Sequence, residues 1–121
     1  MLILDTYVRK AKILRVVDAD TIDVQLSLGY DVWTTQRLRL ADIDAWEKRG
    51  EERLLGKKAA EVVEKLLPVG STCYVKTFKS AKGKYGRYLA QVYYPACDGG
   101  EYHDLGSFLL KEGHAVPYGD K

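Results

Sequence analysis

The spacing of the apolar residues changes near residue 51, and this change constrains the fold more than any other feature. Before it, residues 21–28 alternate apolar and polar side chains, which predicts a strand with one buried face. The residues expected to point inward are Ile22, Val24, Leu26 and Leu28. After it, apolar residues recur at intervals of four and three, which predicts a helix over residues 51–67. The expected buried stripe of that helix is Leu55, Ala59, Val62 and Leu66.

Further strands are predicted on both sides of the helix. The stretches that predict strands are 8–17, 21–28, 32–40, 71–78 and 87–94. Pro68 and Gly70 end the main helix, and Asp104 is the expected N-cap of a short helix over 105–112. The pattern predicts an α+β, mainly β chain in which helices pack on a small five-stranded barrel. An OB-fold and an SH3-like barrel both fit it.

Length and charge narrow the classes of function. The 121 residues fit one domain, which we expect to span 1–121. The net charge is +2, so any attraction to a phosphate backbone has to come from local clusters of basic residues. No apolar run approaches the ~20 residues of a membrane span, and no signal peptide is recognisable. We expect a cytoplasmic protein without a membrane partner, or a secreted one if a leader was removed.

The two cysteines, Cys73 and Cys97, do not have the spacing of a zinc site. Two reduced thiols are expected for a cytoplasmic protein. A disulfide between them remains the alternative.

Three short segments hold the residues with chemical potential: 18–21 (Asp-Ala-Asp-Thr), 39–47 and 84–87 (Lys-Tyr-Gly-Arg). Asp20 and Asp44 lie at neighbouring strand ends, so with a backbone carbonyl they predict an open site of oxygen ligands. Such a site suits Ca²⁺, which accepts flexible coordination, better than Mg²⁺. The alternative is that Asp20 caps its turn and Asp44 accepts bonds from local backbone N–H groups.

Two arginines and a glutamate could complete a phosphodiesterase. Arg39 and Arg87 are the candidate phosphate clamp, because planar guanidinium groups donate paired hydrogen bonds to phosphate oxygens. Glu47 is the candidate general base that deprotonates the attacking water. Either arginine could instead be a surface residue or a partner of an acidic side chain, and Glu47 could be a helix N-terminal glutamate. Arg37 is the competing candidate for this role. We prefer Arg39, because only the spacing counted from Arg39 puts Asp44 and Glu47 at the expected positions.

In this order and spacing, the three segments resemble those of the thermonuclease (staphylococcal nuclease-like) family. Asp18–Thr21 is similar to that family's Asp-Gly-Asp-Thr turn, Arg39–Glu47 to its Arg-Leu-x-x-(Val/Ile)-Asp-(Thr/Ala)-Pro-Glu segment, and Lys84–Arg87 to its Lys-Tyr-Gly-Arg hairpin. The resemblance runs from about Ala11 to about Tyr118. It implies a five-stranded OB-type barrel.

The resemblance also implies roles for single residues. Asp20 and Asp44 would be Ca²⁺ ligands, with the carbonyl of Ala45 completing the protein set and Asp18 acting through water. Lys84 and Tyr85 would touch a terminal phosphate, and Tyr118 would lie under a base. Since tyrosine faces stack on any base, these residues fit sequence-tolerant binding of unpaired strands.

The expected activity is therefore Ca²⁺-dependent hydrolysis of DNA and RNA, preferably single-stranded, by a monomer. The resemblance implies products with 3′-phosphate ends. The alternative is a barrel that has lost the reaction and binds single-stranded nucleic acid or a protein. The chain departs from the family at Trp46, where a proline would stiffen the loop of Glu47, and at Ala19, where glycine is usual. Asp42 has no assigned role and is expected to be an exposed loop residue.

Overall fold

The computed structural model describes residues 8–78, 88–95 and 100–120. Its first half contains three long strands, a short strand and the main helix, in the order β1 (Val8–Asp18), β2 (Thr21–Gly29), β3 (Val32–Leu40), β4 (Ile43–Ala45), η1 (Gly50–Glu52) and α1 (Arg53–Leu66). The second half contains β5 (Thr72–Phe78), β6 (Tyr88–Pro95), β7 (Tyr102–Asp104), α2 (Leu105–Lys111) and β8 (Ala115–Pro117). The predicted strands and helices are present, with ends that differ by one or two residues.

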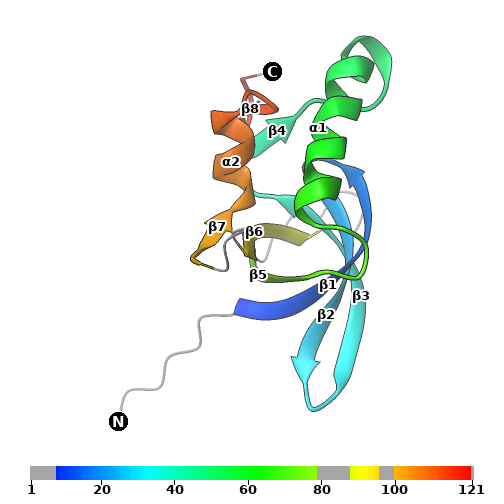
Figure 1. The fold of residues 1–121 in the computed structure, drawn as a ribbon, viewed down its shortest axis with the longest axis vertical. Coiled ribbons are helices and arrows are strands. Elements are labelled where there is room, and N and C mark those ends of the chain that lie inside the picture. The colour runs from blue at the N-terminus through cyan, green and yellow to red at the C-terminus, as the bar shows by residue number, and fades with distance from the viewer. Residues whose placement is uncertain (1–7, 79–87, 96–99, 121) are drawn as a thin grey trace.

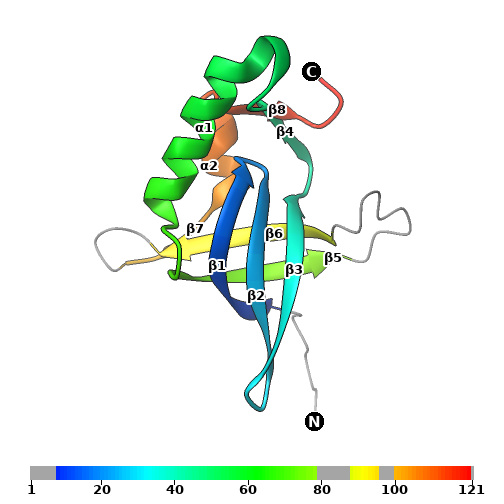
Figure 2. The same ribbon diagram turned by 90° about the vertical axis from the view of Figure 1, so that its right-hand side faces the viewer.

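Five of these strands close into a barrel. The sheet order is β3-β2-β1-β5-β6-β7, and an additional parallel pairing of β3 with β6 joins Leu38 to Tyr88 and Leu40 to Ala90. All other pairings in this sheet are antiparallel. The helix α1 follows the third barrel strand and lies beside the end of β1 (Figures 1 and 2). This is the predicted mainly β, OB-type barrel with one main helix and a short C-terminal helix.

The barrel interior holds the alternating apolar residues of the strands, with one exception to the prediction. Ile22, Val24 and Leu26 are buried as expected, but the prediction for Leu28 was wrong, because that side chain is 52% exposed. Leu28 belongs to the end of the β2–β3 hairpin, which extends past the crossing strands β5 and β6 (Figure 2). Alternation continues there, but no second layer covers it.

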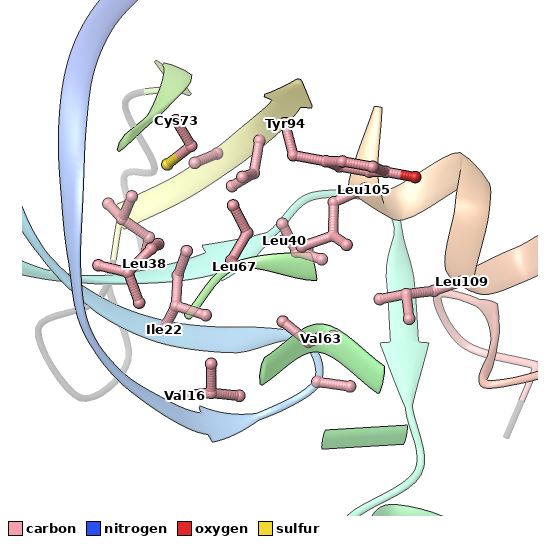
Figure 3. Close-up of a cluster of buried hydrophobic side chains, with 14 of the residues drawn as sticks. Val16, Ile22, Leu38, Leu40, Val63, Leu67, Cys73, Tyr94, Leu105 and Leu109 are labelled. Atoms are coloured by element: carbon pink, nitrogen blue, oxygen red, sulfur yellow. The ribbon is translucent and has the colours of Figure 1, made fainter. Parts of the chain in front are cut away.

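The buried face of α1 was predicted correctly at Ala59, which is fully buried, but was wrong by about one residue elsewhere. Leu55 is 52% exposed, and Val62 and Leu66 are only half-buried. The buried positions on this helix and just after it are Gly56, Ala59, Ala60, Val63 and Leu67. Val63 and Leu67 reach into the same cluster as Val16 and Ile22 (Figure 3). Small residues at the buried positions allow the helix to lie close to the barrel end.

A second small sheet lies beyond the barrel end. In it β4 pairs with β8, so that Asp44 is opposite Val116 and Ala45 is opposite Ala115. Asp104 is the N-cap residue of α2 as predicted, but its carboxylate accepts a bond from the Ser107 hydroxyl (2.8 Å) and caps no backbone N–H. This sheet fixes the position of the segment that carries Asp44.

Two remaining predictions can be compared with the described residues. Cys73 is a free thiol with a fully buried side chain, and Cys97 lies outside the described ranges. Burial raises the pKa of the Cys73 thiol to about 12. None of the helices in the described part of the chain is long and apolar enough to span a bilayer.

Candidate active site

The β1–β2 turn, the end of β3 and strand β4 lie close together at one end of the barrel. Asp20 sits in that turn, and its carbonyl oxygen accepts a hydrogen bond from the N–H of Leu40 at 2.8 Å. Ala19 is fully buried and is not among the residues with positive φ, so the turn does not need the glycine that is usual there. The turn therefore holds Asp20 against the end of β3, one residue from Arg39.

Arg39 lies between the carboxylates of Asp20 and Asp44. Its Nη2 donates to Asp20 Oδ2 at 3.5 Å and to Asp44 Oδ1. Its Nη1 donates to the carbonyl of Ile43 at 3.2 Å. The side chains are only 16%, 11% and 20% exposed for Arg39, Asp20 and Asp44. The sequence-predicted arginine and the two predicted metal ligands thus form one partly buried group of charges.

Neutral donors complete the surroundings of the two carboxylates. Asp20 accepts the N–H of Ala45 at 3.0 Å and the hydroxyl of Thr21 at 3.1 Å. Asp44 Oδ2 accepts the N–H of Gly119 at 3.3 Å. Two ionised carboxylates and one guanidinium leave one uncompensated negative charge, which would repel a phosphate. Among these three side chains, a bound cation would offset that charge.

The residues fit a hard divalent cation. Asp20 and Asp44 already converge on one positive group, so a second positive charge can be held by the same oxygens. The available ligands are carboxylate and carbonyl oxygens without sulfur or imidazole, a set that suits Ca²⁺. Within the described ranges, no group of three or more His, Cys, Asp or Glu side chains gathers, so an ion here would depend on carbonyl oxygens and water for its remaining ligands.

Arg37, the competing arginine, is outside this group. It makes a two-pronged ion pair with Asp23, with distances of 2.7 and 3.1 Å. The hydrogen bond to Asp23, together with its charge, raises the pKa of Arg37 above its ordinary value. The two arginines on the outer side of β3 therefore have different partners, and only Arg39 reaches Asp44.

The segment after β4 holds Glu47 by its backbone. The N–H of Glu47 donates to Glu52 Oε2 at 2.9 Å, and the N–H of Lys48 donates to Asp18 Oδ1 at 3.3 Å. The Glu47 side chain is exposed, and its carboxylate has no hydrogen bond or ion pair to any described residue. A carboxylate in water on a fixed backbone is available to accept a proton.

Trp46, which stands where the resemblance expects a proline, is held at both its backbone and its ring. Its indole Nε1 donates to the carbonyl of Gly113 at 3.0 Å, and its backbone N–H donates to the carbonyl of His114 at 3.3 Å. The side chain is half-buried. The tie to the α2–β8 turn restrains the start of the Glu47 segment, which proline would have stiffened through φ.

Gly56 in helix α1 determines how close the helix approaches Glu47. A Cβ built on Gly56 would lie 1.9 Å from the carbonyl oxygen of Glu47 and 2.5 Å from the nitrogen of Lys48. Only a residue without a Cβ fits this contact. The roles of Gly56 and Glu52 were not predicted from the sequence. The available signal for Gly56 was a glycine inside a predicted helix. Glycine there costs about 1 kcal/mol relative to alanine, so its presence indicates a packing requirement.

Tyr118, which the resemblance expects under a base, lies beside Arg39. The centre of its ring is 5.6 Å from Cζ of Arg39, and the ring is largely exposed. Its backbone N–H donates to the carbonyl of Asp42 at 3.0 Å. Asp42 is an exposed turn residue with φ 65°, as expected of a residue without a role in the site. Lys84, Tyr85 and Arg87 lie outside the described residues.

Comparisons with known proteins give two matches. A family model described as "Staphylococcal nuclease homologue" matches residues 37–120, a range that begins after Asp20 and includes Arg39, Asp44 and Glu47. Among curated proteins, the chain is similar to "Endonuclease YhcR" of Bacillus subtilis (strain 168), with 35% identity over 112 residues. That alignment covers 86% of this chain but 8% of the relative, so the chain spans about one twelfth of the length of that protein.

Proposed function

Because the chain belongs to the family of staphylococcal nuclease homologues, we propose that it is a nuclease, a hydrolase of phosphodiester bonds. The relative that bears the name endonuclease supports the same activity. We further propose that the reaction depends on Ca²⁺, tolerates any base sequence and acts on DNA and RNA. Its products would carry 3′-phosphate ends.

One observation carries the proposal. Asp20, Asp44 and Arg39 come from three different elements and meet in a single hydrogen-bonded group at the end of the barrel. Glu47 follows three residues after Asp44, on a segment that Asp18 and Glu52 hold by its N–H groups. The candidates for the metal ligands and for the phosphate-binding arginine thus form one group, and the candidate base follows on the adjoining segment.

The residues that would hold Ca²⁺ are Asp20, Asp44 and the carbonyl oxygen of Ala45. When bound, the ion would neutralise charge on the phosphate and lower the pKa of nearby water. With the two carboxylates engaged in this way, the guanidinium of Arg39 is no longer their only positive partner. It can then donate paired hydrogen bonds to a phosphate lying beside them.

The chain's own groups would carry out the hydrolysis. The carboxylate of Glu47 accepts a proton from the attacking water, whose oxygen forms a bond to phosphorus. Arg39 and Arg87 donate to the phosphate oxygens, which gain negative charge as the bond to the 5′ oxygen breaks. The departing 5′ oxygen takes up a proton from solvent, and the phosphate remains on the 3′ side.

We assign substrate binding to Lys84, Tyr85 and Tyr118. Lys84 and Tyr85 would bind a terminal phosphate, and the exposed ring of Tyr118, beside Arg39, would stack on a base. Stacking on an aromatic face does not select among bases, which supports action without sequence preference. Unpaired strands offer their base faces, so single-stranded substrates are preferred.

The test is digestion of heat-denatured DNA by the purified chain, with Ca²⁺ and with the Ca²⁺ chelated, beside a Glu47→Ala variant. Fragments that appear only with Ca²⁺ and disappear in the variant would support both the nuclease and its base. Intact substrate under every condition would rule out the nuclease and leave the alternative, a barrel that only binds. End analysis of the fragments checks the 3′-phosphate.

A further inference from the structure

The outer side of β3 leads from the proposed active site to an exposed tryptophan. Leu38 and Leu40 point into the barrel, so Arg39 and every second residue before it lie on the opposite side. Thr35 and Trp33 follow on this outer side, and both are exposed. In Figure 2, strands β1, β2 and β3 lie side by side toward the viewer, and no helix lies in front of them.

Basic side chains lie on the same outer side of β1, which pairs with β2, the strand next to β3. Lys10, Lys12 and Arg15 of β1 are exposed, and within the described residues none of them takes part in a salt bridge. On β2 the outward acidic residue is Asp23, whose charge is already paired with Arg37. The outer side of these three strands therefore carries a surplus of positive charge, although the whole chain is nearly neutral.

Trp33 and Lys12 combine an aromatic face with a cation. Nζ of Lys12 lies 5.2 Å from the centre of the Trp33 ring, and Trp33 keeps 37% of its surface exposed. An aromatic ring offers a surface on which any base can stack, and a neighbouring ammonium group suits the adjoining phosphate. Neither residue contacts the carboxylates of the proposed active site.

We propose that this surface, made of Lys10, Lys12, Arg15, Trp33 and Thr35 and here called the Trp33 face, binds the part of a single strand that extends beyond the cleavage site. The inference rests on the proposed function and adds a second contact region for the same substrate. Positive charge and an exposed indole match a single-stranded nucleic acid, whereas lysine, which occurs twice here, is depleted in protein–protein interfaces.

The length of the surface is consistent with this ligand. Arg39 stands six positions after Trp33 on β3. At ~3.3 Å per strand residue this is roughly 20 Å, room for about six stacked nucleotides at ~3.4 Å each. Single OB-folds bind on the order of 4–16 nucleotides, so the estimate lies within the usual range.

The first test measures binding without cleavage, in the presence of a Ca²⁺ chelator. The chain has two tryptophans, so in Trp46→Phe all tryptophan fluorescence, excited selectively over that of the tyrosines, comes from Trp33. An oligothymidylate of about twelve nucleotides should quench this fluorescence, and one of about three should not. Lys12→Gln should reduce the slope of log K against log salt by about 0.7. Equal quenching by both lengths, or none by either, would overturn the proposal.

The second test measures cleavage of the same two oligonucleotides. Trp33→Ala should raise KM for the longer one by about five-fold or more, with kcat unchanged and the shorter one unaffected. Tyr30→Asn is the matched control, because Tyr30 is a fully exposed aromatic residue in the β2–β3 turn, outside the Trp33 face. Unchanged KM in Trp33→Ala, or an equal change for both lengths, would refute the Trp33 face.

The two experiments separate this inference from the proposed function. Quenching of Trp33 without any cleavage would refute the nuclease and leave the Trp33 face as the site of a binding module. Cleavage without length-dependent quenching would leave the nuclease and refute the Trp33 face.

Discussion

The indole nitrogen of Trp46 donates a hydrogen bond to the carbonyl oxygen of Gly113, 3.0 Å away. This bond connects the segment that leads from Asp44 to Glu47 with the turn that follows α2. Removing it with Trp46→Phe keeps most of the ring and the backbone bond to His114. The expected cost is about 1 kcal/mol of folding stability and a lower kcat, since the Glu47 segment loses one restraint. Urea unfolding and steady-state kinetics check both values; an unchanged kcat would show that the tie does not position Glu47.

Gly56→Ala should destabilise the protein, although alanine normally favours a helix by about 1 kcal/mol. The new Cβ would lie 1.9 Å from the carbonyl oxygen of Glu47, so the helix or the Glu47 segment must move. We expect a loss of about 1–3 kcal/mol and reduced cleavage. Lys57→Ala, at the next and exposed position of the helix, is the control and should change neither. A gain in stability for Gly56→Ala would contradict the close packing described above.

Arg39→Ala should have two effects. Cleavage should fall by about 10³–10⁵-fold, the range for an arginine that stabilises a transferring phosphoryl group. The variant should also unfold more easily without Ca²⁺, because the partly buried carboxylates of Asp20 and Asp44 lose the cation between them. Arg37→Ala is the control and should change stability little, because its ion pair with Asp23 is open to solvent on the arginine side. Retained cleavage in Arg39→Ala would remove this residue from the mechanism.

Calcium should raise the melting temperature of the wild-type chain. An ion that binds only the folded state at about one hundred times its Kd contributes about 2.7 kcal/mol. Asp20→Asn keeps a similar shape but removes one charge, so the Ca²⁺-induced shift should largely disappear. Calorimetry with and without Ca²⁺ measures it, and an equal shift in both proteins would place the ion elsewhere.

The Cys73 thiol should make stability depend on pH at the alkaline end. Burial raises its pKa in the folded chain to about 12 from an ordinary value of 9.0. The protonated form is favoured in the folded state, so this contribution is complete below pH 9 and is lost as the pH rises toward 12. Unfolding free energies of wild type and Cys73→Ala, measured between pH 8 and 11, should therefore converge as the pH rises. A constant difference would argue against the burial effect.

The sequence predicted most of the fold because its local patterns agree with the final architecture. Alternation placed Ile22 and Val24 inside, and their burial is confirmed. It failed at Leu28, since alternation shows which side a residue takes but not where the covering layer ends. The helix was found, but its buried face was wrong by one position because Val62 and Val63 are both apolar. The small residues Gly56, Ala59 and Ala60 pack against the barrel, and this contact puts Val63 rather than Val62 on the buried side.

The candidate site was predictable only where residue type reveals chemistry. The carboxylates and Arg39 could be singled out in advance, and the structure brings them together. The bonds that hold the Glu47 segment could not, because an N–H group that bonds to Glu52 or Asp18 leaves no mark in the sequence. The same holds for Trp46, whose partner Gly113 is 67 residues away along the chain.

The pairing of β4 with β8 has a consequence for the stage of folding at which the candidate site is assembled. Asp44 lies opposite Val116, and the barrel closes through contacts between Leu38 and Tyr88. Contacts between such distant parts of a chain form late, because a long loop must first be closed. During synthesis, Asp20, Arg39 and Asp44 emerge well before β6, which closes the barrel, and β8, which pairs with β4. Under the proposed function, a growing chain therefore carries its candidate catalytic groups before the site is assembled. It should not cleave the messenger RNA from which it is being translated.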